Sequence, residues 1–365
     1  MSGWSFYNPV DLRFGEGVFD QVPEVLRGRR YLLVTHPDAV FQPLRARLSD
    51  LVGAPVAVAD QVEPNPSLRM LEPMCAELAA IAGDVDVIVA LGGGSVIDTA
   101  KFLAAGHMDY ASTRDYLEGR GDLPARALPI IAIATTAGTG SDLTKWATIW
   151  DPQTGRKLSL NRADLFPEVA LVDPELTYSL PWSLTLATGL DALSHALESN
   201  WNRNANPVTR HYAQAAASDI LSALPLLQAD PADRQARAVL SRGATLAGLA
   251  FSNTMTALAH NISYAVTLQK GLVHGIACSF TLPLVMEAAL GLDRECDATI
   301  GAIFDCPPAQ APAKLRAILA ALGIADDPAA YGYDAGQWRE IVTTAIDGPR
   351  GRNFIGSIEA FPFAA

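Results

Sequence analysis

The chain has 365 residues, of which 50% are hydrophobic and 18% are charged, so it can bury a large interior. Its 27 Lys and Arg and 39 Asp and Glu give a formal net charge of -12, and no cluster of basic residues is present, which argues against a nucleic-acid-binding protein. A single hydrophobic core rarely grows beyond about 250–300 residues, so we expect two domains.

The sequence carries no sign of export or of membrane insertion. The N-terminal stretch "MSGWSFYNPVDLRFGEG" lacks a basic region followed by an apolar run, and no apolar stretch reaches the ~20 residues that span a bilayer. The four cysteines are scattered without CxxC spacing, which disfavours a disulfide framework or a zinc ribbon. We therefore expect a cytoplasmic enzyme that contacts no membrane.

Residues 1–181 alternate between strand and helix patterns. Helices are expected at 66–83 and 95–106, between short runs rich in β-branched residues. The runs that read as buried strands are Tyr31–His36, Val85–Leu91, Pro129–Thr136 and Glu168–Asp173. This alternation predicts a Rossmann-like α/β domain with a parallel sheet covered on both faces.

Residues 182–365 have a different sequence pattern, in which Ala- and Leu-rich amphipathic segments replace the strand patterns. We expect a helical C-terminal domain here, joined to the first domain through the proline-bearing segment 173–183. The predicted fold is thus α/β plus all-α, with domains at 1–181 and 182–365.

The segment "VDVIVALGGGSVIDTAK" (85–101) reads as a strand, a glycine turn and a helix. Gly92, Gly93 and Gly94 leave room for a phosphate at the helix N-terminus, where Ser95 can cap the helix or bind a ligand oxygen. The pattern is not GxGxxG, and a tight turn without a ligand is the alternative. The segment "IAIATTAGTGSD" (131–142) ends another strand with Thr and Gly residues, and two such loops at one sheet edge suit a dinucleotide.

Only six histidines are present, and three lie in apolar helical segments of the second half. Asp191 and His195, in "GLDALSHALES", are four residues apart and share a helix face. Together with His260 and His274 they form a carboxylate and three imidazoles that suit Fe²⁺ or Zn²⁺. A structural hydrogen bond between Asp191 and His195, and histidines buried only for packing, remain alternatives at this point.

Several motifs in order resemble the iron-containing alcohol dehydrogenase family over nearly the whole chain. "GGGSVIDTAK" resembles the family's GGGSxxDxAK, and "TTAGTGSD" its TTxGTGSE with Asp142 in place of Glu. "ALVDPELTYSLP" and "GLDALSHALES" resemble its DPxL…P and GxDAxxHxxE segments, and His260 and His274 match its paired histidines.

The resemblance implies a metal between a dinucleotide domain and a helical domain, an NAD(P)H cofactor, and a homodimer. It implies Asp191, His195, His260 and His274 as ligands of Fe²⁺ or Zn²⁺. The nucleotide would lie against the glycine turn and neighbouring residues. These cofactor-binding positions are His36, Asn65, Gly92, Gly93, Gly94, Ser95, Asp98, Thr135, Thr136, Thr139, Thr144 and Lys157.

Two positions depart from the family pattern. Tyr264 stands where many members have a proton-relaying histidine, and a tyrosine hydroxyl can also pass a proton. His36, with Asp38 two residues on, stands where NAD-preferring members often have Asp, so both NADH and NADPH are kept as candidate cofactors. Segments around Tyr264 are most similar to the hydroxyethylphosphonate dehydrogenase branch, which reduces phosphonoacetaldehyde. Candidate cations for a phosphonate are Lys145, Lys157, Arg162, Arg203 and Lys270, with Arg350 and Arg352 as weaker candidates.

The expected chemistry is hydride transfer from the nicotinamide to an aldehyde polarised by the metal. The small-molecule substrate is thus an aldehyde or alcohol, with a generic alcohol or diol dehydrogenase as the first alternative. A dehydroquinate-synthase-like lyase is disfavoured by the DAxxH segment and the spaced histidine pair, and a metal-free binding protein by the four coordinating residues. We expect Glu198 to bond locally on its helix, and Cys278 to serve packing rather than to act as a nucleophile or a fifth metal ligand.

Overall fold

The computed structural model describes residues 3–363. The chain folds into two compact units, and each unit is made of segments that are not contiguous in the sequence. The sheet unit comprises residues 9–136 and 141–177, and the helical unit comprises, among the described residues, 3–8, 137–140 and 178–363. Each unit is described separately below.

The sheet unit is built on a six-stranded parallel sheet with the order β1-β8-β5-β4-β2-β3. The strands of this sheet are β1 (Asp11–Phe14), β2 (Tyr31–Thr35), β3 (Ala57–Ala59), β4 (Val87–Gly92), β5 (Ile130–Ala134) and β8 (Val169–Val172). The four strands predicted from β-branched runs are its four central strands, in the register Val89↔Ile131 and Ile131↔Val169.

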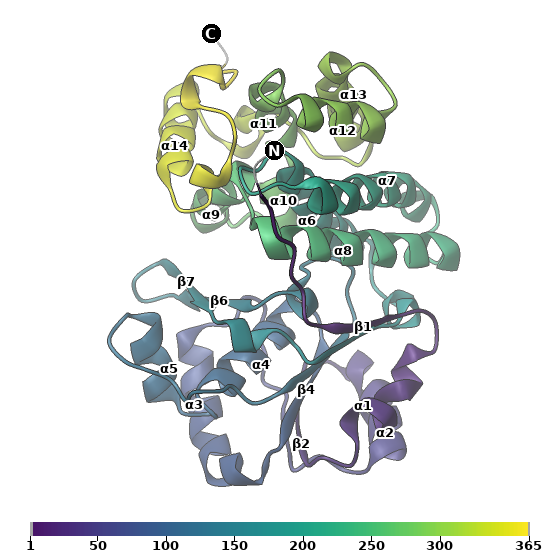
Figure 1. Ribbon diagram of the computed structural model, residues 1–365, viewed down its shortest axis with the longest axis vertical. Coiled ribbons are helices and arrows are strands. Elements are labelled where there is room, and N and C mark those ends of the chain that lie inside the picture. The colour runs from purple at the N-terminus through teal and green to yellow at the C-terminus, as the bar shows by residue number, and fades with distance from the viewer. Residues whose placement is uncertain (1–2, 364–365) are drawn as a thin grey trace. The chain divides into compact units, whose positions relative to one another are not determined.

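Helices cover both faces of this sheet (Figure 1). The helices are α1 (Val22–Leu26), α2 (Gln42–Val52), α3 (Leu68–Leu78), α4 (Gly94–Ala105) and α5 (Tyr110–Leu117). Successive strand residues alternate between two cores: Leu32 and Ile88 face the core that includes α3 and α4, whereas Leu33 and Val89 face the core that includes α1. Because both faces are buried, the strands carry continuous apolar runs without polar alternation.

Several elements of the sheet unit differ from the sequence-based expectation. The edge strands β1 and β3 were not predicted, because "DLRF" carries two charges and "AVA" is only three residues long. The antiparallel hairpin β6 (Trp146–Asp151) and β7 (Arg156–Asn161) was also missed. The helix expected over 66–83 ends at Leu78 and continues as a 3₁₀ helix to Asp84.

The helical unit contains nine α-helices among its described residues. They are α6 (Trp182–Asn200), α7 (Pro207–Ala229), α8 (Arg234–Thr254), α9 (Leu258–Lys270), α10 (His274–Ser279), α11 (Leu282–Ala289), α12 (Arg294–Phe304), α13 (Ala311–Ala321) and α14 (Ala335–Asp347). One apolar cluster runs through this unit and includes Leu190, Leu193 and Trp201. The expected combination of a parallel α/β unit with a helical unit is confirmed. None of the helices within residues 3–363 has the length and apolar character needed to cross a bilayer.

The loop 137–140 joins the helical unit by close packing. A Cβ on Gly138 would lie 2.6 Å from Cβ of Thr188 on α6, and one on Gly140 would lie 2.7 Å from Cε1 of Phe251 on α8. Gly140 also has φ of +59°, which disfavours a side chain. The two glycines therefore allow the loop backbone to approach helices, which gives them a packing role independent of any ligand.

Candidate active site

Three helices of the helical unit carry the predicted metal ligands. Asp191 and His195 lie on α6, His260 lies on α9, and His274 is the first residue of α10. Helix α10 packs against both α6 and α9. The approach to α6 is so close that a Cβ on Gly275 would lie 1.8 Å from the carbonyl oxygen of Ala187, so only glycine fits at that position.

The three imidazoles converge on one oxygen of Asp191. The Oδ1 atom of Asp191 lies 3.4 Å from Nε2 of His260, 3.8 Å from Nε2 of His274 and 3.9 Å from Nε2 of His195. The ring of His195 stacks on that of His260 with centroids 4.6 Å apart. The structure thus brings together all four residues that the sequence singled out.

Three members of this cluster are buried, the side chain of His274 is 31% exposed, and their charges are electrostatically coupled. Asp191 and His260 are 5% and 3% exposed, and neither Oδ1 of Asp191 nor Nε2 of His260 has a hydrogen-bond partner. Burial would raise the pKa of Asp191, but the positive charge available on His195, His260 and His274 outweighs it and holds that pKa below its ordinary value. Buried polar atoms without partners are costly, so this arrangement calls for a ligand.

A divalent metal ion fits these side chains. Metal–nitrogen and metal–oxygen bonds of about 2.0–2.2 Å place two tetrahedral ligands roughly 3.3–3.6 Å apart. The 3.4 Å separation of Asp191 Oδ1 and His260 Nε2 falls in that range, and the 3.8 Å separation to His274 is slightly longer. One carboxylate and several imidazoles are a donor set suited to zinc or ferrous iron.

Glu198 holds the ring of His260 through Nδ1. The expectation that Glu198 bonds locally on its own helix was wrong, because its partners lie on and just before α9. Its buried carboxylate accepts a hydrogen bond from Nδ1 of His260 at 2.6 Å. It also accepts from three backbone N–H groups at the start of α9, those of Ala257, Ala259 and His260. The first N–H groups of a helix need acceptors, and Ala257 as N-cap offers no side-chain oxygen, so the remote glutamate provides them.

Cys278 lies among the donors. It is one helical turn after His274 on α10, is fully buried, and its Sγ lies 3.6 Å from Nε2 of His274. The groups whose donor atoms all lie within 4.8 Å of one another are Asp191, His260, His274 and Cys278. Burial would raise the pKa of the Cys278 thiol, but His260 and His274 lower it to about 7. The burial of this cysteine agrees with the expected packing role, and its sulfur also lies within reach of the candidate metal ligands.

The predicted proton-relay residue also borders this cluster. Tyr264 follows His260 by one turn on α9, and its ring lies nearly parallel to that of His274, with an interplanar angle of 12° and centroids 6.5 Å apart.

The glycine turn follows β4 in the sheet unit as expected, but Ser95 does not cap the helix. Helix α4 begins at Gly94, and its N-cap Gly93 makes no side-chain hydrogen bond. The Ser95 hydroxyl instead accepts from the backbone N–H of Asn65, a residue with φ of +59°. A Cβ on Gly92 would lie 2.5 Å from Val96 Cγ2, so close packing is one reason for glycine there. Binding of a phosphate at this turn stays a prediction.

Other predicted nucleotide positions have structural partners. The carboxylate of Asp98 accepts from the Ser141 hydroxyl at 2.6 Å and from Thr148 N at 2.8 Å. One turn later, the fully buried Lys101 donates to the carbonyl oxygens of Ser141 and Trp146 and to the hydroxyl of buried Thr144. Burial lowers the pKa of Lys101 to about 8. These bonds fix the segment 141–148 on α4.

The remaining predicted nucleotide positions lie at strand ends or in loops. Thr135 N donates to the carbonyl oxygen of Gly92, which ties the ends of β5 and β4 together, and Thr136 lies against Gly93. His36 Nδ1 is 3.3 Å from a carboxylate oxygen of Asp38 just after β2. Lys157 lies on β7 above the Trp150 ring, and Thr139 lies in the loop 137–140.

Most of the predicted phosphonate-binding cations have other partners. Arg162 pairs with Asp164, Arg203 Nε donates to the carbonyl oxygen of Phe354, and Lys270 Nζ donates to that of Gly332. Lys145 directly precedes β6 in the sequence and is partly buried. Arg162, Arg203 and Lys270 therefore each have a structural partner of their own.

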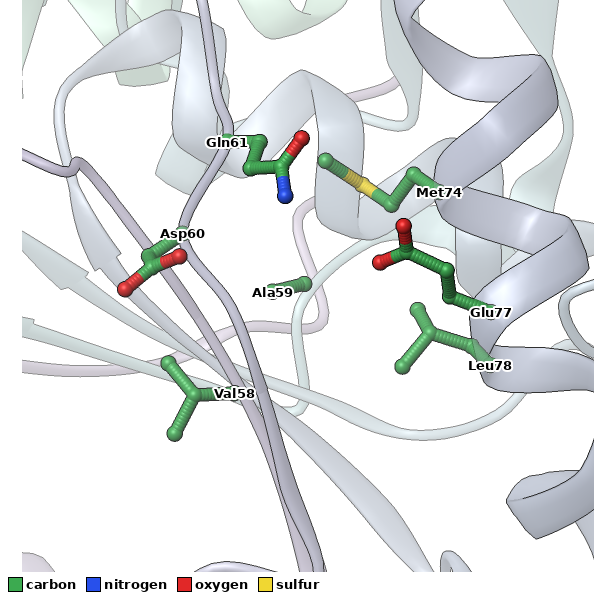
Figure 2. Close-up of a pocket in the computed structure, with 7 residues that line it drawn as sticks. All are labelled: Val58, Ala59, Asp60, Gln61, Met74, Glu77 and Leu78. Atoms are coloured by element: carbon green, nitrogen blue, oxygen red, sulfur yellow. The ribbon is translucent and has the colours of Figure 1, made fainter.

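A small pocket lies between the edge strand β3 and helix α3 of the sheet unit, and no residue of the glycine turn lines it (Figure 2). The side chains of Gln61, Met74 and Glu77 face one another across it. The pocket encloses about 30 Å³, whereas ligand sites usually enclose about 300–1,000 Å³, so it is a poor candidate for the active site.

Comparisons with known proteins assign the family. Residues 9–174 match the family model of iron-containing alcohol dehydrogenase, and residues 185–354 match the C-terminal model of the Fe-containing alcohol dehydrogenase family. The chain therefore belongs to the iron-containing alcohol dehydrogenase family, a family of oxidoreductases.

Similar proteins include several named enzymes. Alcohol dehydrogenase 4 of Saccharomyces cerevisiae is 32% identical over 78% of this chain and 75% of its own length. Phosphonoacetaldehyde reductase of Streptomyces viridochromogenes is 35% identical over 75% of this chain and 72% of its own length. A crystal structure of sulfoacetaldehyde reductase from Bifidobacterium kashiwanohense in complex with NAD⁺ has a TM-score of 0.89 and 28% identity, covering 99% of this chain and 96% of that chain.

Proposed function

We propose that this chain is a metal-dependent, NAD(P)H-dependent aldehyde reductase, and that its substrate is phosphonoacetaldehyde, reduced to 2-hydroxyethylphosphonate. The main support for a metal centre is that Nε2 atoms of His195, His260 and His274 all lie within 3.9 Å of one buried oxygen of Asp191. In a member of a family of metal-dependent alcohol dehydrogenases, this convergence supports a catalytic metal centre.

Asp191, His195, His260 and His274 are the proposed metal ligands. When bound, a divalent ion supplies Lewis-acid polarisation of a carbonyl group, and the nicotinamide supplies a hydride. Glu198 holds Nδ1 of His260 so that Nε2 points toward Asp191. Tyr264 lies next to His274 and would pass a proton from solvent through its hydroxyl to the product oxygen.

The substrate proposal is supported by two similar proteins. One is named phosphonoacetaldehyde reductase and the other sulfoacetaldehyde reductase, and both names denote an acetaldehyde that carries an anionic oxyacid group. The sulfoacetaldehyde reductase contains NAD⁺, which supports a nicotinamide cofactor at the glycine turn of this chain. His36, rather than a carboxylate, directly after β2 leaves NADPH open as the preferred form.

A generic alcohol or diol dehydrogenase is the second candidate. It is favoured by the local partners of Arg162, Arg203 and Lys270, which leave these cations less suited to bind a dianion. Burying a dianion without a cationic partner is very costly.

The test is a comparison of substrates with the zinc- or iron-loaded enzyme. Phosphonoacetaldehyde, sulfoacetaldehyde, acetaldehyde and butyraldehyde are each supplied with NADH or NADPH, and loss of absorbance of the reduced cofactor is followed. We expect the highest kcat/KM with phosphonoacetaldehyde. Equal kcat/KM for acetaldehyde or butyraldehyde would exclude the phosphonate assignment and favour the second candidate.

A further inference from the structure

The group of candidate metal ligands contains a sulfur donor, Cys278, in addition to the carboxylate and the imidazoles. Cys278 lies on the same face of α10 as His274, because residues four apart on a helix overlie one another. Its sulfur is fully buried, and it lies 3.6 Å from Nε2 and 3.8 Å from Nδ1 of His274.

The position of this sulfur matches that of a ligand. With a metal–sulfur bond of about 2.3 Å and a metal–nitrogen bond of about 2.0–2.1 Å, two tetrahedral ligands lie roughly 3.5 Å apart. The separation of Cys278 Sγ and His274 Nε2 is 3.6 Å, and that of His260 Nε2 and Asp191 Oδ1 is 3.4 Å. The same cluster contains two buried polar atoms that have no hydrogen-bond partner, Oδ1 of Asp191 and Nε2 of His260.

The composition of the tightest donor set supports the same conclusion. The four groups whose donor atoms all lie within 4.8 Å of one another include Cys278 and omit His195. His195 instead stacks on Phe251 with ring centroids 4.0 Å apart and reaches Asp191 Oδ1 at 3.9 Å, the longest of the three imidazole contacts. Cys278 therefore lies close enough to Asp191, His260 and His274 to bind the same ion.

We propose that Cys278 is a further ligand of the metal ion, so that a thiolate sulfur joins the carboxylate oxygen and the imidazole nitrogens of the proposed ligand set in a mixed site. This inference rests on the proposed metal centre and specifies its chemistry. Binding replaces the S–H bond by a metal–sulfur bond and releases the thiol proton to solvent, without any change in oxidation state. Thiolate ligands favour zinc and cobalt over hard ions such as Mn²⁺ and Mg²⁺.

The first test reads the metal–sulfur bond directly in the full chain. The purified protein is stripped of metal with a chelator and reconstituted with Co²⁺, and its absorption spectrum is recorded. We expect a near-ultraviolet thiolate-to-cobalt charge-transfer band beside the visible bands of the cobalt ion. Visible bands without the charge-transfer band would overturn the role of Cys278 and leave the metal centre standing. Failure of Co²⁺ and Zn²⁺ to bind at all would overturn both.

Variants give the second test. Cys278→Ser should abolish the charge-transfer band and weaken Zn²⁺ binding by at least about tenfold, while changing Mn²⁺ binding much less. Cys306→Ser is the matched control, because Cys306 is a free cysteine outside the donor set, and it should retain both the band and the affinity. An unchanged Zn²⁺ affinity in folded Cys278→Ser, or equal losses for Zn²⁺ and Mn²⁺, would overturn the proposal.

Discussion

Glu198 and His260 form a buried pair in which the carboxylate fixes both a side chain and the helix that carries it. The glutamate accepts from Nδ1 of His260 at 2.6 Å and from the backbone N–H of the same residue at 3.2 Å. Since a carboxylate can only accept, Nδ1 carries a proton and Nε2 is left to face Asp191. The orientation of one proposed metal ligand thus depends on a residue 62 positions earlier in the chain.

Glu198→Gln should weaken metal binding without removing a ligand. The neutral amide still fills the space but loses the charge-assisted bond to His260, and loss of such a support typically costs about 10–100-fold in metal affinity. Zn²⁺ affinity, measured by competition with a chromophoric chelator, checks this. The exposed Glu340→Gln serves as the control. Identical Zn²⁺ affinities in the two folded variants would contradict the supporting role.

Metal affinity should fall as the pH falls from 8 to 6. The metal-free cluster holds protons that a metal must displace: His260 has a pKa well above its ordinary value, and Cys278 has a pKa of about 7. Below the pKa of each such ligand, the dissociation constant should rise about tenfold per pH unit and per proton released. Titrations at pH 6, 7 and 8, corrected for the protonation of the competing chelator, measure the slope. A dissociation constant independent of pH would show that no ligand proton is displaced.

Lys101 should make the stability of the protein depend on alkaline pH. Its pKa falls from 10.5 to about 8 through burial, so between these values the unfolded chain binds more protons than the folded one. Stability therefore rises with pH across about 8–10.5, by on the order of 3 kcal/mol in total. Lys101→Met lacks this contribution, and the difference in unfolding free energy between wild type and variant, from urea titrations, should grow between pH 7.5 and 9.5.

The exposed Lys314→Met provides the comparison for this experiment. If the wild-type advantage over Lys101→Met stays constant or shrinks with rising pH, then the lysine is not held with a lowered pKa.

Gly275→Ala should damage the cluster although glycine offers no donor. The new Cβ would lie 1.8 Å from the Ala187 carbonyl oxygen, so α10 must move away from α6. Overpacking of this kind costs about 1–3 kcal/mol, and the movement would shift His274 and Cys278. Thermal unfolding and cobalt absorption report the two effects. Gly83→Ala, at an exposed glycine with nothing within 4 Å of the new Cβ, should change neither.

Tyr264→Phe tests the proposed proton relay. General acid–base groups contribute about 10²–10⁴-fold, and a relay that solvent can partly replace should lie at or below the lower end of that range. We expect kcat to fall by about tenfold or more, with KM and bound metal nearly unchanged. Tyr264→His, which supplies an imidazole as another proton-relaying group, should recover much of the loss. Full activity of the phenylalanine variant would remove Tyr264 from the mechanism.

The central sheet was predictable from sequence, whereas its edges were not. Runs such as Tyr31–Thr35 and Val87–Gly92 are buried at every position because helices cover both faces, and this pattern is local. The edge strand Asp11–Phe14 is only partly buried and carries Asp and Arg, so its pairing with Val169–Val172 depends on contacts far away in sequence.

The candidate site divides in the same way. The spacing of Asp191 and His195 placed them on one helix face, but the approach of His260 and His274 depends on the packing of three helices and could be expected only through the family resemblance. The contacts of Glu198 could not be predicted from the sequence, because its partners lie 59–62 residues later. The proposed role of Cys278 could not be predicted from the sequence, because a four-residue spacing from His274 is also compatible with simple packing.

The division of the chain into two units has a consequence for how this fold can be rearranged. The backbone passes from one unit to the other four times, after Asn8, Thr136, Gly140 and Thr177. A gene fragment that begins at Tyr178 would lack residues 137–140, whose glycines pack against Thr188 and Phe251. No single crossover point can therefore exchange one half of this protein for that of a relative and keep each half intact; a working chimera needs matched junctions at all four passages.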